Sequence, residues 1–373
     1  MKPRSLYALP AVVLIGVSCA QLPRQPPSEA VRSAPTGEPV SIRNGEFAFK
    51  GPDFTAWLVA PDGSGLRPIS LPDTTAMIVP WAYSPDGAHI AYTGYERGDA
   101  GDYAIYVSNA DGSDVTDLTS TYLDPAENNQ GGPVWSPDSR QIAFWNDSND
   151  PSAQGVYLMN ADGRDVHKIA DGGSPAWSPD GGSIAFAAAA SEGSDIYSVS
   201  IDGSRLTRLT HTPAVEAFPD MVAGGFADRL HRVHGRRTAL GDGCRWAHRH
   251  AVTDIPNDGM GGFSPDWSPD GTTIAFEVFD GHSWNIYTVH PDGTDLRPLA
   301  DGPGDEIQPV WSPDGSLVAY MASPQGSGAG GNNTGTYDVY TTRLNGTVTR
   351  VTTDAGGAGG SLAWRPLPDD ADA

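Results

Sequence analysis

Residues 177–186 read WSPDGGSIAF, and this phrase decides the fold because the chain repeats it. The other copies are YSPDGAHIAY (83–92), WSPDSRQIAF (135–144), WSPDGTTIAF (267–276), WSPDGSLVAY (311–320) and a degenerate WRPLPDD (364–370). Ser-Pro-Asp-Gly favours a type I turn, because proline presets φ at the second position and aspartate tolerates the third. Each copy therefore predicts a strand that ends at the aromatic residue, a tight turn and a second, apolar strand.

A second phrase follows each full copy and carries its own turn signal. It reads Ile/Val-Tyr, a few residues, then Asp-Gly or Asn-Gly, as in IYVSNADG (105–112), VYLMNADG (156–163), IYSVSIDG (196–203), IYTVHPDG (286–293) and VYTTRLNG (339–346). Asp-Gly or Asn-Gly between alternating strands is a strong hairpin signal. Each repeat therefore predicts four antiparallel strands, a to d, in which the aromatic residue at the end of strand a is a core anchor. The anchors are Tyr83, Trp135, Trp177, Trp267, Trp311 and Trp364.

The two phrases together resemble the TolB-type β-propeller repeat, a relative of WD40 repeats in architecture. The resemblance covers about residues 45–366 and is specific for the fold but not for function. It implies an all-β protein with a single β-propeller, in which four-stranded blades pack side by side.

The spacing of the anchors predicts seven blades. The interval from Trp177 to Trp267 is about twice the others, which indicates one hidden unit. Residues 47–69 supply strands b, c and d without a strand a, and Leu362–Trp364 supply a lone strand a. The C-terminal strand would thus complete the N-terminal blade and close the ring, which leaves no free sheet edge. The count falls to six if the hidden unit is not a blade.

Residues 221–252 lie in the hidden unit and differ from the rest of the chain, because arginine and histidine crowd into an otherwise acidic protein. Three interpretations are open. The first is a metal site of His231, His234, Cys244, His248 and His250, although their spacing matches no known zinc pattern. The second is a basic loop that docks on acidic loops.

The third interpretation, which we favour, is that this segment is translated out of frame. Synonymous codons for MVAGGFADRLH (221–231) can be chosen so that a reading frame shifted by one nucleotide encodes WSPGGSRIAF. Codons for GDGCRW (241–246) can be chosen so that the same shifted frame encodes MDVDG. These are the two repeat phrases in the right order, and the frame would return near Thr253. Under this interpretation the blade lacks its anchors and packs poorly.

The N-terminus predicts export and a lipid anchor. Lys2 and Arg4 precede an apolar run, 6–17, that is too short to span a bilayer. The junction Ser18-Cys19 resembles the lipobox of bacterial lipoproteins, which implies lipidation of Cys19, although Gly16 departs from the usual leucine. Plain secretion is the alternative. We expect a signal segment at 1–19, a Pro-rich tether at 20–40, the propeller at 41–366 and an acidic tail at 367–373.

The net charge of the protein restricts the classes of partner that it can bind. A formal net charge of −23 disfavours nucleic acid and anionic membrane surfaces. Basic partners and cations remain open. We expect an unidentified protein partner in the cell envelope, with the membrane reached only through the lipid anchor. Cys19 and Cys244 are the two cysteines, which excludes a disulfide framework.

The b–c and d–a connections lie at one end of each predicted blade, and we call this end the variable face. These connections differ in length and sequence, whereas the a–b and c–d turns are uniform, and binding usually occurs on variable loops of a rigid frame. We expect an acidic binding rim there, made of Glu96, Asp99, Asp102, Asp124, Glu127, Asp147, Asp150, Asp305 and Glu306. Solvation of the rim is the alternative role for these acids.

The sequence predicts no catalytic residue, cofactor or bound metal. It contains no G-x-S-x-G elbow, P-loop or H-E-x-x-H motif. A propeller lyase or hydrolase acting on an extracellular carbohydrate or peptide is the enzyme alternative. Its candidate histidines share no motif spacing and are His89, His211, His282 and His290. We therefore expect a binding or scaffold protein.

Overall fold

The computed structural model describes most of the chain between residues 42 and 368. The described ranges are 42–50, 56–69, 75–96, 103–120, 122–123, 128–190, 193–209, 216–222, 229–234, 239–241, 250–251, 263–280, 282–291, 293–323, 337–353 and 362–368. Residues Val40–Ala373 form one compact unit. The predicted signal segment with Cys19, the Pro-rich tether and the acidic tail lie outside the described residues, apart from Leu367 and Pro368.

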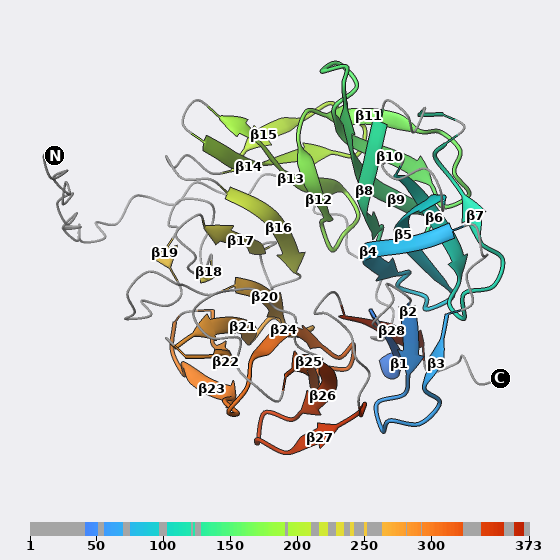
Figure 1. Ribbon diagram of the computed structural model, residues 1–373. Coiled ribbons are helices and arrows are strands. Elements are labelled where there is room, and N and C mark those ends of the chain that lie inside the picture. The colour runs from blue at the N-terminus through green and yellow to red at the C-terminus, as the bar shows by residue number, and fades with distance from the viewer. Residues whose placement is uncertain are drawn as a thin grey trace, which may run out of the picture. The chain divides into compact units, whose positions relative to one another are not determined.

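Every regular element among the described residues is a β-strand, and the strands form seven four-stranded antiparallel sheets (Figure 1). In those ranges no helix is long and apolar enough to cross a bilayer. The first three sheets contain β28 (Leu362–Pro368), β1 (Ile42–Lys50), β2 (Ala56–Val59) and β3 (Arg67–Pro68); β4 (Thr75–Tyr83), β5 (His89–Glu96), β6 (Ala104–Asn109) and β7 (Thr116–Asp117); and β8 (Asn128–Trp135), β9 (Gln141–Ser148), β10 (Gly155–Asn160) and β11 (His167–Ala170).

The remaining sheets follow in chain order. They contain β12 (Gly173–Trp177), β13 (Ser183–Ala190), β14 (Gly193–Ser200) and β15 (Leu206–Arg208); β16 (Glu216–Val222), β17 (Arg229–His234), β18 (Ala239–Gly241) and β19 (His250–Ala251); β20 (Phe263–Trp267), β21 (Ile274–Phe279), β22 (Trp284–Val289) and β23 (Arg297–Ala300); and β24 (Glu306–Trp311), β25 (Val318–Ala322), β26 (Asp338–Thr342) and β27 (Val348–Arg350). The predicted all-β architecture of four-stranded antiparallel units is confirmed.

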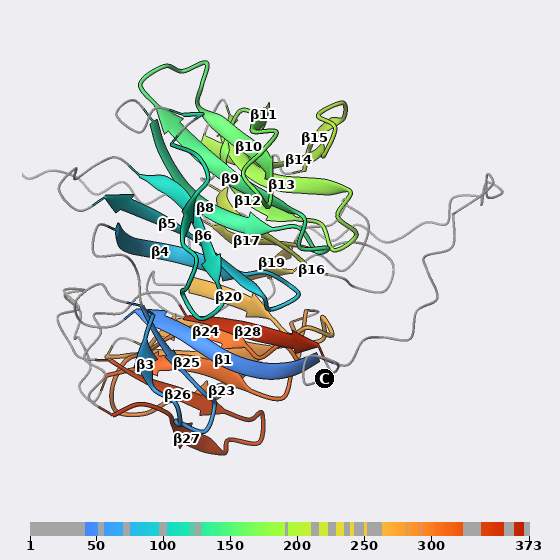
Figure 2. The same cartoon turned by 90° about the vertical axis from the view of Figure 1, so that its right-hand side faces the viewer.

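The C-terminal strand belongs to the same sheet as the N-terminal strand. β28 pairs with β1 in antiparallel register, with Trp364 opposite Phe47 and Pro368 opposite Ile42, and the two strands lie side by side in Figure 2. The Trp364 and Phe47 rings meet edge to face at 4.8 Å between centroids. β28 also contacts β4 of the second sheet and β24 of the seventh.

The Ser-Pro-Asp turns share one hydrogen-bond pattern in all five full copies. In the turn after Trp177, Ser178 Oγ donates to Asp180 Oδ1 at 2.6 Å and accepts from the Ser183 amide at 2.9 Å. The Gly182 amide also donates to Asp180 Oδ1 at 2.9 Å. The equivalent Ser–Asp pairs are Ser84–Asp86, Ser136–Asp138, Ser268–Asp270 and Ser312–Asp314. These bonds lower the Asp180 pKa, with the Ser178 hydroxyl as the main cause. The turn therefore satisfies its polar groups locally.

The recurrent aromatic residues of strands b and c contact each other within five of the seven sheets. Phe186 lies opposite Tyr197 with centroids 5.9 Å apart, and Phe144 lies opposite Tyr157 at 5.6 Å. The same pair recurs as Tyr92–Tyr106, Phe276–Tyr287 and Tyr320–Tyr340. Each pair packs against buried apolar side chains between neighbouring sheets. Burial of this apolar surface contributes most of the stability of such a fold.

The six predicted anchors are all buried, with 4–8% of each side chain exposed. Three of them also join neighbouring sheets, because their indole N–H donates to the carbonyl just before the anchor of the adjacent sheet. These bonds are Trp135 Nε1 to Ala82 O (3.0 Å), Trp177 Nε1 to Val134 O (3.1 Å) and Trp364 Nε1 to Val310 O (3.1 Å).

The fifth sheet contains the unusual segment 221–252. Strand β16 shifts register between Ala217 and Asp220, as strand β20 does between Phe263 and Asp266, so Met221 occupies the place of Trp267. Trp267 pairs with Ile274, seven residues on, whereas Met221 pairs with Leu230, nine residues on. The hidden unit therefore forms a four-stranded sheet with a different register. The structure does not describe the side chains of this sheet. The metal-site, basic-loop and out-of-frame interpretations therefore stay predictions.

Candidate functional site

The acids of the predicted rim fall into three groups in the structure. Asp147 at the end of β9 and Asp150 after it are exposed. Asp305 and Glu306 are buried, with 0% and 5% exposed. The others lie outside the described residues or, for Glu96, have a side chain that is not described; these are Glu96, Asp99, Asp102, Asp124 and Glu127.

The burial of Asp305 and Glu306 corrects the prediction that these two acids belong to an exposed rim on a variable connection. Asp305 Oδ1 accepts the Trp284 amide at 3.0 Å, which ties the start of β24 to the sixth sheet. Burial raises the pKa of Glu306 to about 7, with a smaller contribution from nearby carboxylates. Glu277, also buried, accepts the Gln308 amide at 2.6 Å, and burial raises its pKa. These carboxyls therefore belong to the packing between the sixth and seventh sheets.

A cleft of about 590 Å³ opens at the variable face between the third and fourth sheets. Its lining residues come from the end of β9, the following b–c connection, the d–a connection before β12 and the end of β13. They are Trp145, Asn146, Asp147, Pro151, Gln154, Asp171, Gly172, Gly173, Ser174, Ala188 and Ala189. The cleft brings the predicted Asp147 together with Trp145 and Asp171, which the sequence reasoning missed.

Trp145 is a half-buried side chain of the cleft, and two glycines allow its position. It pairs with Gly131 of β8. A Cβ at Gly131 would overlap the indole ring, and a Cβ at Gly132 would lie 2.7 Å from the indole Nε1. Gly132 has a φ of 59°, which favours glycine as well. Glycine at both positions therefore lets the indole lie directly against the backbone of β8.

Trp145 departs from the repeat, and this departure is the signal that sequence reasoning could have used. The residue after the b-strand aromatic is Thr93, Ala187, Glu277 or Met321 in other full copies. A large aromatic side chain here, opposite a Gly-Gly pair, is unique to the third sheet among these copies. An aromatic residue that the repeat does not require is a candidate for ligand contact.

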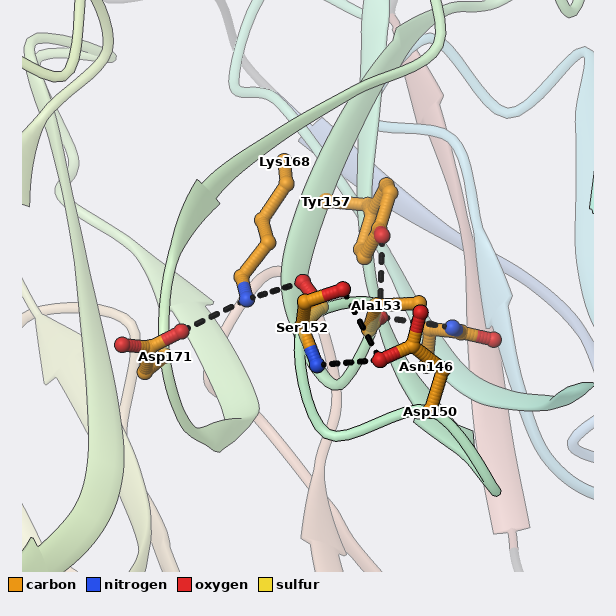
Figure 3. Close-up of polar contacts among 7 residues, drawn as sticks. All are labelled: Asn146, Asp150, Ser152, Ala153, Tyr157, Lys168 and Asp171. Carbon is orange, nitrogen blue, oxygen red and sulfur yellow. Dashed lines mark hydrogen bonds and ion pairs between the residues drawn. The ribbon is translucent and has the colours of Figure 1, made fainter.

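The b–c connection of the third sheet is held by its own hydrogen bonds (Figure 3). Asp150 Oδ1 accepts the Ser152 amide at 2.9 Å and the Ser152 hydroxyl at 2.8 Å, and these bonds lower the Asp150 pKa. Asn146 Nδ2 and the Tyr157 hydroxyl both donate to the Ala153 carbonyl, at 2.8 and 2.9 Å. The connection is therefore preorganised beside the cleft.

Lysine and glutamine side chains position the carboxylates of the cleft. Lys168 Nζ donates to the Ser152 carbonyl at 2.9 Å and lies 2.6 Å from Asp171 Oδ1, as Figure 3 shows. Gln154 Nε2 donates to Asp147 Oδ1 at 3.1 Å and to the Ser148 carbonyl at 2.8 Å. The lining contains two carboxylates and no lysine, arginine or histidine. Its electrostatic potential therefore favours a cation.

The described ranges contain no group of three or more His, Cys, Asp or Glu side chains arranged to hold a metal ion. Of the four histidines weighed for an enzyme, His211 lies outside those ranges. His290 lies at a c–d turn, where its Nδ1 is 3.2 Å from Thr294 Oγ1. His89 begins β5, and His282 follows β21. Thus His89 lies in the second sheet, whereas His282 and His290 both lie in the sixth sheet, at opposite ends of β22.

Comparison with known proteins gives a family match to the TolB beta propeller domain over residues 53–233. Among curated proteins, none matches the sequence. Oligogalacturonate lyase from Vibrio parahaemolyticus is a similar solved structure, with 13% identity, coverage of 85% of this chain and 89% of the lyase, and a TM-score of 0.57. TolB from Acinetobacter baumannii has 19% identity, coverage of 75% and 67%, and a TM-score of 0.48.

A puromycin-hydrolyzing peptidase from Mycobacterium tuberculosis is also similar, with 15% identity and a TM-score of 0.53. The match covers 84% of this chain and 54% of the peptidase, so the chain corresponds to about half of that protein. At these identities the likeness concerns the fold. The repeat phrases, the four-stranded sheets and the family match agree, and the chain is therefore a β-propeller protein of the TolB type.

Proposed function

We propose that this protein is a non-enzymatic binding module of the cell envelope that captures a protein partner on its variable face. In this proposal residues 1–19 direct export, Cys19 carries the lipid anchor and residues 20–40 form the tether. The acidic partner-binding rim includes Asp147 and Asp150, and extends to the rim acids outside the described residues. The propeller is the rigid frame on which the rim is displayed.

The frame in this proposal is a closed ring of seven blades. Three features support it: there are seven four-stranded sheets among the described strands, β28 completes the sheet of β1, and β24 of the seventh sheet contacts β28. Contacts between β17 and β20 link the unusual fifth sheet to the sixth. A closed ring leaves no unpaired sheet edge inside it.

One observation carries the functional proposal: the cleft at the variable face is built from residues that depart from the repeat. Trp145 and the Gly131–Gly132 pair have no role in the repeat pattern, yet they create an aromatic surface beside Asp147 and Asp171. At the opposite end of the sheets, by contrast, the Ser-Pro-Asp turns of the five full copies share one hydrogen-bond pattern. Aromatic residues beside polar groups are typical of binding sites.

Site-specific photo-crosslinking in intact cells tests the proposal. A photoreactive residue would replace Asp147 or Asp171 at the variable face, and Asp162 at a c–d turn of the third sheet would be the matched control. We expect one crosslinked protein partner from both cleft positions and none from the control. Crosslinks from the control alone would contradict the proposal.

The enzyme alternative has its own decisive outcome. Some structurally similar proteins are enzymes, among them the lyase and the peptidase described above. The purified protein would be incubated with oligosaccharides and peptides, and product formation measured over many equivalents of protein. Catalytic turnover that Trp145→Ala or Asp147→Asn abolishes would replace the binding proposal with an enzymatic one.

A further inference from the structure

We infer that the cleft between the third and fourth sheets is a recognition pocket for an arginine side chain of the partner. This inference rests on the proposed function for its biological setting, but its chemistry follows from the cleft alone. The lining offers one indole, two carboxylates, amide groups and no cationic side chain. A planar cation is the ligand that uses all of these groups together.

The indole of Trp145 supplies the stacking surface. Its position against Gly131 and Gly132 fixes the ring, because one side of the indole lies on the backbone of β8. A ring held in this way loses little conformational freedom when a ligand stacks on it. A guanidinium group stacks on an aromatic face more favourably than an ammonium group does, because it is planar and more weakly hydrated.

Two carboxylates from different elements line the cleft, and Asp147 supplies most of the countercharge. Asp147 lies at the end of β9 and is oriented by Gln154. Asp171 lies between β11 and β12, with 90% of its side chain exposed and Lys168 beside it. Lys168 pairs with Asp171 and donates to the Ser152 carbonyl, so it offsets the charge of Asp171 and the net negative charge of the cleft comes from Asp147. Guanidinium presents five donors in a fixed plane, which suits carboxylate acceptors.

The size of the cleft fits a side chain with part of its peptide. A volume of about 590 Å³ lies within the range of small-ligand sites, about 300–1,000 Å³, and exceeds the space that a guanidinium alone fills. Gly172, Gly173 and Ser174 also line the cleft, and the absence of a side chain on the two glycines leaves room for an extended chain. We therefore expect an exposed arginine in an extended segment of the partner.

Nuclear magnetic resonance of the indole N–H groups tests this inference directly. The full chain would be labelled with ¹⁵N in its tryptophan indoles, and Trp145→Phe would identify the Trp145 signal. The probe is N-acetyl-arginine amide, and N-acetyl-citrulline amide is its neutral counterpart of nearly the same shape. We expect a saturable shift of the Trp145 signal with the arginine probe. The dissociation constant of the citrulline probe should be larger by a factor of at least about ten.

Matched variants separate the cleft from the general negative charge of the protein. Asp147→Asn should weaken binding of the arginine probe about threefold to tenfold. Asp162→Asn removes the same charge at the turn end of the third sheet and should leave binding unchanged. Equal weakening by both variants would mean nonspecific attraction and would overturn the inference.

Each remaining outcome supports or overturns either arginine recognition or the proposed function. Equal shifts with arginine and citrulline, or a shift with methyl glucoside but not with arginine, would overturn arginine recognition. If a partner crosslinks to the cleft while the arginine probe gives no shift, the proposed function stands and the inference fails. If the probe binds but no partner crosslinks, the inference stands and the proposed function fails.

Discussion

Replacing Gly87 with alanine tests how the C-terminal strand packs against the second sheet. Gly87 ends the Ser-Pro-Asp turn between β4 and β5 with a φ of 69°. A Cβ added there would overlap the carbonyl oxygen of Pro366 in β28. Nε of Arg365 also donates to the Gly87 carbonyl oxygen at 2.7 Å. The substitution therefore disturbs the contact between β28 and this turn.

Three effects add up in the expected loss of stability. The left-handed backbone costs a residue with a Cβ about 1 kcal/mol. Moving β28 to remove the overlap costs about 1–3 kcal/mol, as in overpacked cores. Weakening the Arg365 hydrogen bond costs about 1 kcal/mol. We expect Gly87→Ala to lower the free energy of unfolding by about 3–5 kcal/mol.

Gly181→Ala is the matched control, because Gly181 occupies the same place in the repeat. Its φ is also 69°, but a Cβ there would have Cδ of Pro137 as its nearest neighbour, at 3.8 Å. Only the backbone strain of about 1 kcal/mol applies. Urea unfolding followed by circular dichroism gives both free energies by linear extrapolation. Equal losses for the two variants would refute the reasoning that β28 packs on the Gly87 turn.

Three further predictions concern the anchor, a buried acid and the fifth sheet. Cys19→Ser should move the protein from the membrane fraction to the soluble fraction on immunoblots; unchanged membrane association would exclude lipidation as the tether. The Glu306 pKa is raised from 4.5 to about 7 in the folded state, so the folded protein binds this proton more tightly and stability should fall as pH rises from about 4.5 to 7. Glu306→Gln should flatten that dependence in thermal unfolding scans at several pH values, and an unaltered slope would show that another group titrates. Nucleotide sequencing should show that codons 221–246, read in a frame shifted by one nucleotide, contain WSPGGSRIAF and then MDVDG, and the frame-restored chain should melt at a higher temperature; a shifted frame without the two repeat phrases would exclude this explanation.

The repeat made the sheets predictable because its signals are local. Ser178 and Asp180 lie two residues apart, and their turn forms from groups within six residues. The end of strand a at the aromatic anchor follows from the same turn. The partnership of β28 with β1 was also predictable, because a lone strand a at one end of the chain matches a missing one at the other.

The site was less predictable because it depends on contacts between sheets. Residues 301–308 have the composition of an exposed loop, yet β24 begins at Glu306 and the carboxyl is buried. Gln308 adopts a φ of 55° before a proline, a conformation that glutamine seldom takes. The Trp145 cleft needs Gly131 against the indole and Asp171 from the connection before β12, and no local pattern joins these residues.

The pairing of β1 with β28 sets how the protein responds to mechanical load. Ile42 and Pro368 face each other at one end of the pair, so the chain enters and leaves the sheet at that end. Tension between the N-terminal side and the C-terminus would open the strands as a zipper opens, breaking backbone bonds one after another. A shearing geometry would load all these bonds at once and would withstand more force. A pull on the two ends therefore detaches β28 first, at low force, and leaves the edge of β1 exposed for re-pairing.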